Sequence, residues 1–162
     1  MNGEDLQQCL EQVFQIPEYE TKKISKDISE ALNYLHNLKI GHRDVKLENI
    51  CLQTNSNSLV TTTRGSVSYI SSKILQRKSY GLNVDCWGLG VVIYSLLVGY
   101  RPFRSDDDDE LSLNRVILND QKLSFGEKDW NGIFMDSKDL FTTLLKKDLN
   151  QRMERIQVMK HT

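Results

Sequence analysis

The stretch His42-Arg43-Asp44-Val45-Lys46-Leu47-Glu48-Asn49 decides how this chain is interpreted. It is a polar octet between two apolar runs, the first ending at Ile40 and the second being Ile50-Cys51-Leu52. Within it a carboxylate, a cation and a side-chain amide follow one another closely, in Asp44, Lys46 and Asn49. Such an octet is either an ordinary solvated loop or a loop that gathers three different chemical groups around one site.

Other segments of the chain favour the second interpretation. They are Gly65-Ser66-Val67-Ser68-Tyr69-Ile70, Asp85-Cys86-Trp87-Gly88-Leu89-Gly90-Val91, Gly99-Tyr100-Arg101-Pro102-Phe103, and Leu145-Lys146-Lys147-Asp148 with Arg152. Together with the octet they resemble, in the same order, the sequence motifs of eukaryotic Ser/Thr protein kinases. The resemblance is closest to the calcium/calmodulin-dependent and checkpoint group and extends from Asn2 to His161. It predicts one partial kinase domain over residues 1–162.

The resemblance implies transfer of the γ-phosphoryl group of ATP to Ser or Thr of a protein substrate, with Mg²⁺ as cofactor. Asp44 would be the base that accepts the hydroxyl proton, Lys46 would stabilise phosphate charge, and Asn49 would be a magnesium ligand. This set has a chemical reason, because phosphoryl transfer depends mainly on positioning and electrostatic stabilisation.

Further roles follow from the resemblance alone. Glu48 and Ser66 would contact the substrate, Glu48 at a position where kinases that favour basic motifs hold an arginine. Asp85 would hold the backbone of His42 and Arg43. Arg43 next to the base suggests control by phosphorylation, for which the candidate acceptors are Thr61, Thr62 and Thr63. The alternative role for Asp85 is that of a carboxylate that satisfies free backbone donors at a helix start, and the two roles are compatible.

The chain departs from the kinase pattern at two important places. After Leu59-Val60 the sequence continues with Thr61 to Arg64 and then Gly65. The motif Asp-Phe-Gly, whose aspartate holds magnesium in kinases, does not occur anywhere in the sequence. Asn49 alone is a weak anchor, because Mg²⁺ prefers carboxylate and phosphate oxygens. The segment usually written Ala-Pro-Glu is Ser71-Ser72-Lys73. Lys73 would face Arg152, so one of the two side chains is expected to turn to solvent.

No glycine-rich loop, strand lysine or partner helix of a kinase small lobe precedes Asn2. Two hypotheses account for the departures. The sequence is a partial product of a kinase gene with an internal segment skipped, or it is a pseudokinase that serves as a protein-interaction module. Under either one, we expect negligible turnover.

The expected fold is mainly α: a kinase C-terminal lobe with a small β-hairpin and without the N-terminal lobe. Apolar residues from Val84 to Val98 indicate a helix buried on all sides. Three- and four-residue spacing predicts an amphipathic helix that begins at Pro17 and carries Ile24, Ile28, Ala31, Leu32, Leu35 and Leu38. Two short strands, Ile50–Leu52 and one beginning at Leu59–Val60, are expected around a turn at Gln53–Ser58. Three further helices are expected: one over Leu111–Ile117, one capped by Ser137, and one that carries Ile156 and Met159.

Composition narrows the class of protein. The chain has 162 residues, 39% hydrophobic content and a net charge of −1, which favours one soluble globular domain without a nucleic-acid or membrane partner. Cys9, Cys51 and Cys86 form no Cys-x-x-Cys pair, so neither a disulfide framework nor a zinc site is indicated. With no signal pattern or membrane span, a cytoplasmic or nuclear location is expected. The acidic run Asp106–Glu110 is either a solvated loop or a surface that docks a basic substrate.

Overall fold

The computed structural model describes residues 5–52, 60–61, 82–103, 116–117, 132–148 and 151–152. The elements in this part of the chain are α1 Leu6–Val13, α2 Glu18–Asn37, the 3-10 helix η1 Leu47–Asn49, β1 Ile50–Cys51, β2 Val60–Thr61, α4 Asn83–Val98 and α6 Met135–Leu144. The predicted fold class, mainly α with a small β-hairpin, is confirmed. Among these elements no helix is both long and apolar enough to cross a bilayer.

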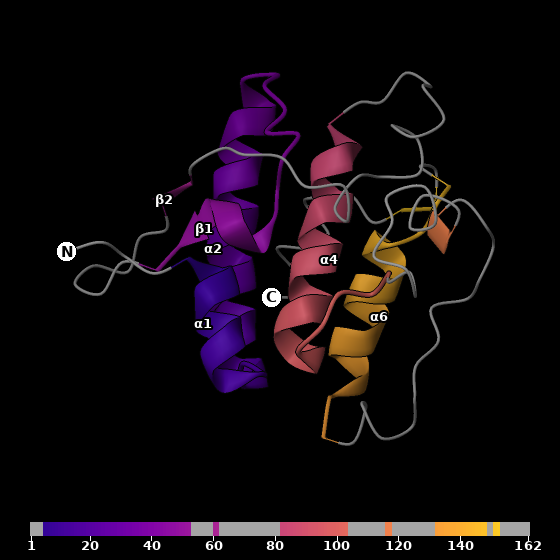
Figure 1. Ribbon diagram of the computed structural model, residues 1–162. Coiled ribbons are helices and arrows are strands. Elements are labelled where there is room, and N and C mark those ends of the chain that lie inside the picture. Colours follow the sequence, from indigo (N-terminus) through magenta and orange to yellow (C-terminus); the bar gives the residue numbers. More distant parts are fainter. Residues whose placement is uncertain are drawn as a thin grey trace.

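Helix α4 is the centre of the core. Every residue from Val84 to Val98 is buried, which confirms the prediction of a helix without a solvent-facing side. A helix that is apolar all round needs neighbours all round. Helices α2 and α6 pack against it, and Figure 1 shows α4 standing between them. The ring of Tyr94 meets the edge of Phe141 at 5.6 Å between centroids, joining α4 to α6.

Helix α2 is amphipathic as predicted, but its buried face is more polar than expected. It buries Thr21, Ser25, Ile28, Ser29, Leu32 and His36. The hydroxyls of Ser25 and Ser29 donate to carbonyl oxygens four residues earlier, at 2.6 and 2.7 Å, so their burial leaves no unpaired hydroxyl. Pro17 is the N-cap rather than the first helical residue, and Leu38 lies beyond the helix end with 55% of its surface exposed.

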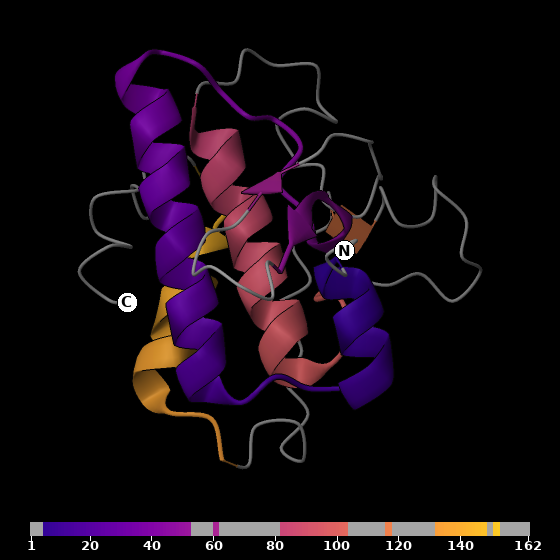
Figure 2. The same ribbon diagram turned by 90° about the vertical axis from the view of Figure 1, so that its left-hand side faces the viewer.

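Helix α1 was not expected from the sequence. Asp5 and Gln8 form a capping box, in which the Asp5 carboxylate accepts from the Gln8 N–H at 2.8 Å. The helix buries Leu6 and Leu10 and contacts η1, and Figure 2 shows the two side by side. The Asp-x-x-Gln spacing was the signal that could have found it.

The predicted hairpin is present as a two-stranded antiparallel pair. Ile50 lies opposite Thr61 and Cys51 opposite Val60. Leu59, where the return strand was expected to begin, lies outside the described residues. Cys51 also forms an isolated bridge with Asp5, which ties the start of α1 to this hairpin. The predicted turn, Gln53–Ser58, lies outside the described residues.

The start of α6 differs from the prediction. Ser137 was expected to cap this helix, but α6 begins at Met135 and its N-cap is Phe134, which offers no side-chain acceptor. The cap comes instead from α2: the Glu18 carboxylate accepts from the Phe134 N–H at 3.2 Å and from the Ser137 hydroxyl. Local sequence could not show this, because the acceptor lies more than a hundred residues away in the chain.

Several predicted features fall outside or at the edge of the described residues. These are the acidic run Asp106–Glu110, the helix around Ile156 and Met159, and most of the helix expected over Leu111–Ile117. Of the last, Val116 and Ile117 are described as helical, and Ile117 is fully buried. Cys9, Cys51 and Cys86 form no disulfide bond.

Candidate active site

The octet follows α2 in the chain, and its last three residues form η1. A carboxylate of α4 binds the backbone of its first two residues. Asp85 accepts hydrogen bonds from the backbone N–H groups of His42 and Arg43, at 2.9 and 2.6 Å. The contact expected between Asp85 and this backbone is therefore present. Asp85 is only 1% exposed, so water cannot easily replace either bond.

His36 is a third partner of Asp85, and sequence reasoning missed it. Its Nε2 atom lies 2.6 Å from Asp85 Oδ2, and the imidazole is 1% exposed. The available signal was its position one helical turn beyond Leu32 on the buried face of α2. The Asp85 carboxylate thus joins the end of α2, the octet and the start of α4.

Arg43 holds an unusual backbone conformation. Its φ is +64°, in the left-handed region that non-glycine residues rarely adopt. Phe14 and Lys39 also have positive φ, but they follow the ends of α1 and α2, where such a conformation commonly terminates a helix. Arg43 lies inside a loop, where this conformation costs on the order of 1–3 kcal/mol and persists only when its surroundings hold it. The Asp85 bond to the Arg43 N–H is one such restraint.

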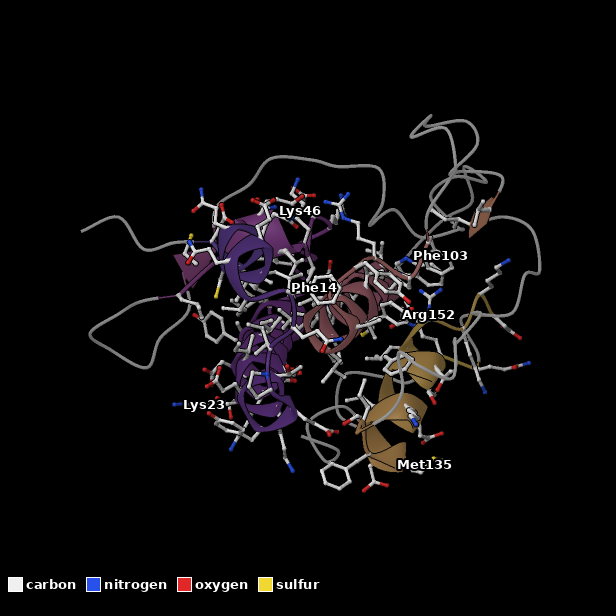
Figure 3. The ribbon with its side chains drawn as sticks, turned by 60° about the horizontal axis from the view of Figure 1, so that its bottom comes forward. Phe14, Lys23, Lys46, Phe103, Met135 and Arg152 are labelled. Carbon is white, nitrogen blue, oxygen red and sulfur yellow. The ribbon has the colours of Figure 1, made fainter. Side chains whose placement is uncertain are left out.

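Asp44, Lys46 and Asn49 lie close together, as the resemblance to a kinase catalytic loop implied. Asn49 Nδ2 donates to both the backbone oxygen and the Oδ2 of Asp44, each at 2.8 Å. Lys46 Nζ lies 3.5 Å from the same Oδ2. Figure 3 shows Lys46 far from the exposed Lys23 of α2. Both contacts fall on Oδ2, which leaves Oδ1 as the oxygen without a partner among the described residues.

Gly88 lets α4 approach the octet closely. A Cβ atom at this position would lie 2.7 Å from the carbonyl oxygen of Val45 and 2.8 Å from its Cβ, closer than such atoms can sit. The residue between Asp44 and Lys46 is thus packed directly on the α4 backbone. No local sequence pattern indicated this close approach, because Val45 and Gly88 are far apart in the chain.

Glu48 has an internal partner that sequence reasoning also missed. Arg101, in the loop after α4, places Nη2 2.9 Å from Glu48 Oε1, and the two side chains are 32% and 31% exposed. The other carboxylate oxygen, Oε2, is buried and has no hydrogen-bond partner among the described residues.

Arg152 is buried, at 3% exposure, against the Trp87 ring. It donates to the carbonyl oxygens of Lys146 and Asn83, at 2.8 and 3.1 Å, and burial lowers the pKa of its guanidinium to about 10. Its Nη2 finds no partner among the described residues. Figure 3 shows Arg152 and Phe103 on the same side of the molecule. Lys73, which was expected opposite Arg152, lies outside the described residues.

The donors present do not make a complete magnesium site. The described residues contain no group of three or more His, Cys, Asp or Glu side chains placed to hold a metal ion. The octet supplies two carboxylates, Asp44 paired with Lys46 and Glu48 paired with Arg101, and one amide, that of Asn49. Mg²⁺ binds through carboxylate and phosphate oxygens in octahedral geometry, so this set does not fit it unaided. The remaining predicted site residues, Thr62, Thr63 and Ser66, are not described.

A comparison with protein-family models decides the family. The model described as the protein kinase domain matches residues 1–162. The chain belongs to the protein kinase domain family. Members of this family act on proteins and generally use ATP and Mg²⁺.

The relatives of this kinase chain include named Ser/Thr kinases. It is 34% identical to the serine/threonine-protein kinase DCLK3 of Mus musculus, over 99% of this chain and 22% of that protein. It is 30% identical to the serine/threonine-protein kinase DCLK1 of Rattus norvegicus, over 99% of this chain and 41% of that protein. It is 33% identical to the CaM kinase-like vesicle-associated protein of Danio rerio, over 89% of this chain and 38% of that protein.

This chain is shorter than its relatives, both overall and within the aligned region. The kinase chain spans between a fifth and two fifths of the curated relatives just named. The alignment with the mouse protein extends over 178 residues, 16 more than the 162 of this chain. That relative therefore has residues inside the aligned region with no counterpart here.

Proposed function

We propose that the octet His42–Asn49 is the catalytic loop of a Ser/Thr protein kinase domain. Its reaction is transfer of the γ-phosphoryl group of ATP to a Ser or Thr hydroxyl of a protein. The observation that carries this proposal is the convergence of Lys46 and Asn49 on one oxygen of Asp44, beside the restrained backbone of Arg43.

The contacts suggest how the residues divide the work. With Oδ2 of Asp44 held by Asn49 and Lys46, the carboxylate is oriented and Oδ1 can accept a proton from a substrate hydroxyl. The phosphoryl group then moves from the β-γ bridging oxygen of ATP to that hydroxyl oxygen. The Lys46 cation lies beside the base, where it would stabilise the negative charge of the transferred group. Thr62 and Thr63 remain candidate phosphorylation sites.

We further propose that this chain alone has negligible turnover. The sequence contains no Asp-Phe-Gly, and the described residues do not fit magnesium unaided. The mouse protein has additional residues within the alignment, which supports the proposal that this chain lacks an internal segment. In the sequence, the Asp-Phe-Gly of the kinase pattern is missing between Val60 and Gly65.

A pseudokinase interaction module is the second candidate. The observation in its favour is that the apolar core that joins α2, α4 and α6 includes none of Asp44, Lys46 and Asn49. Such a lobe could present a surface to a partner protein without transferring phosphate.

Thermal unfolding in the presence of nucleotide distinguishes the two. A ligand at 100 times its Kd stabilises the folded state by about 2.7 kcal/mol. We expect millimolar ATP with Mg²⁺ to raise the melting temperature, and Lys46→Met to reduce that rise relative to its own nucleotide-free melting temperature. If ATP does not stabilise the protein at any concentration, the interaction module becomes the better account.

A further inference from the structure

The pair formed by Glu48 and Arg101 joins the octet to the loop after α4. Glu48 stands one residue before Asn49 and four after Asp44, so a protein substrate that reaches the base passes close to its carboxylate. That carboxylate is not available as it stands, because Arg101 Nη2 lies 2.9 Å from Oε1. About a third of each side chain is exposed, so the pair is open to a competing charge.

The loop that carries Arg101 is anchored on both sides of it. Before it, Gly99 ends α4 with φ +90°, and Tyr100 meets the ring of Tyr94 edge-on at 5.9 Å. After it, Phe103 stacks on Trp87 with the two rings 4° from parallel and 5.4 Å apart. Arg101 therefore starts from an anchored backbone, which places its guanidinium beside Glu48. A partner tethered in this way acts at high effective concentration.

We propose that Arg101 determines substrate specificity by occupying the carboxylate of Glu48. This inference rests on the proposed kinase function, since it concerns the protein substrate of the same site. Arg101 neutralises Glu48 and repels a second cation, so the site does not select a substrate with a basic side chain at this point. The Glu48 carboxylate binds a substrate arginine only when Arg101 leaves it. Substrates with a neutral side chain there are the class that fits.

Peptide binding to matched variants tests this. The probes are Ser-containing peptides in which one arginine is moved along the flanking positions, each paired with a peptide that carries neutral citrulline instead. The ratio of their dissociation constants, measured by fluorescence polarisation, is the arginine preference. We expect a ratio near one for the native chain. Arg101→Gln should raise it about fivefold at one position, the upper range for an exposed ion pair. The double variant Glu48→Gln with Arg101→Gln should return it to near one.

Lys23→Gln is the matched control, because it removes the same charge from the exposed face of α2, far from the octet. It should leave the arginine preference at the native value. An Arg101→Gln protein with no arginine preference, whether it binds both peptides equally or neither, overturns the inference. So does a preference that survives in the double variant. The ATP-dependent rise in melting temperature of the same proteins reports separately on the proposed function.

Discussion

Asp85 is the residue on which the geometry of the octet depends. One buried carboxylate accepts from two backbone N–H groups and lies against His36. Such an arrangement is sensitive to the loss of charge, because removing one member of a buried, hydrogen-bonded set leaves the others without compensation.

Replacing Asp85 with Asn should lower the free energy of unfolding by roughly 3 kcal/mol or more, because the amide cannot accept all three contacts. Chemical denaturation measures the change. Asp139→Asn, on the exposed side of α6, removes the same charge and should have little effect. Equal stability of the two variants would show that Asp85 does not hold the octet.

The second residue-scale prediction concerns Lys73 and Arg152. The Arg152 guanidinium is desolvated and has a buried nitrogen without a partner among the described residues. By resemblance to other kinases, position 73 would provide a carboxylate, so Lys73→Glu should raise the free energy of unfolding by about 1–3 kcal/mol. A double-mutant cycle with Arg152→Met checks the pairing. The gain should disappear in the Arg152→Met background, and a gain that persists there would refute the pairing.

Residue contacts were predictable from the sequence only where family resemblance indicated them. The Asp85 contact with the octet backbone was expected on that basis. The pairs His36 with Asp85 and Glu48 with Arg101 were not, because each joins residues far apart in the chain and neither leaves a local pattern.

At the scale of elements, α6 depends on a cap donated by another helix. Glu18 accepts from the Phe134 N–H and the Ser137 hydroxyl, and its charge is also favourable at the start of α2. Glu18→Ala should cost about 1 kcal/mol of stability, the usual value of an N-cap. Glu20→Ala is the control, since Glu20 stands in the same first turn of α2. Denaturant titration should show a clearly larger loss for Glu18→Ala, and equal losses would mean that the cap contributes nothing.

The close approach of α4 to the octet gives a second prediction at this scale. Ala favours a helix over Gly by about 1 kcal/mol, yet Gly88→Ala should destabilise the protein because its Cβ would collide with Val45. Gly41→Ala is the comparison, since its Cβ would make contacts no closer than 3.4 Å. Melting temperatures should fall for Gly88→Ala and change little for Gly41→Ala. An unchanged or higher melting temperature for Gly88→Ala would contradict the packing described.

Apolar periodicity predicted the helices that bury a continuous surface. It did not predict a helix terminus that is capped by a residue far away in the sequence. The bounds of α2 and α4 followed from apolar spacing to within a residue or two. The start of α6 did not, because its cap lies on α2. Helix α1 was missed because it is short and only Leu6 and Leu10 are fully buried, although its capping box was visible.

At the scale of the whole molecule, α4 connects the core to the chemistry. The same helix packs between α2 and α6, supplies Asp85 to the octet, and leads into the loop that carries Arg101. The helical lobe can therefore hold the octet in place, while the metal aspartate is missing from the sequence. We therefore propose that the octet is a competent catalytic loop in a chain that lacks part of its site.

Phosphate transfer from ATP to a Ser/Thr peptide tests this proposal. The proteins to compare are this chain, a chimera that carries a kinase small lobe before Asn2 and an Asp-Phe-Gly segment between Thr61 and Gly65, and the same chimera with Asp44→Asn. We predict transfer by the chimera, none by this chain, and a rate lower by about 10²–10⁴ for Asp44→Asn, the usual contribution of a general base. Transfer by the chimera that does not depend on Asp44 would show that Asp44 is not the base. Transfer by this chain at the chimera's rate would show that the octet needs neither the small lobe nor the Asp-Phe-Gly segment.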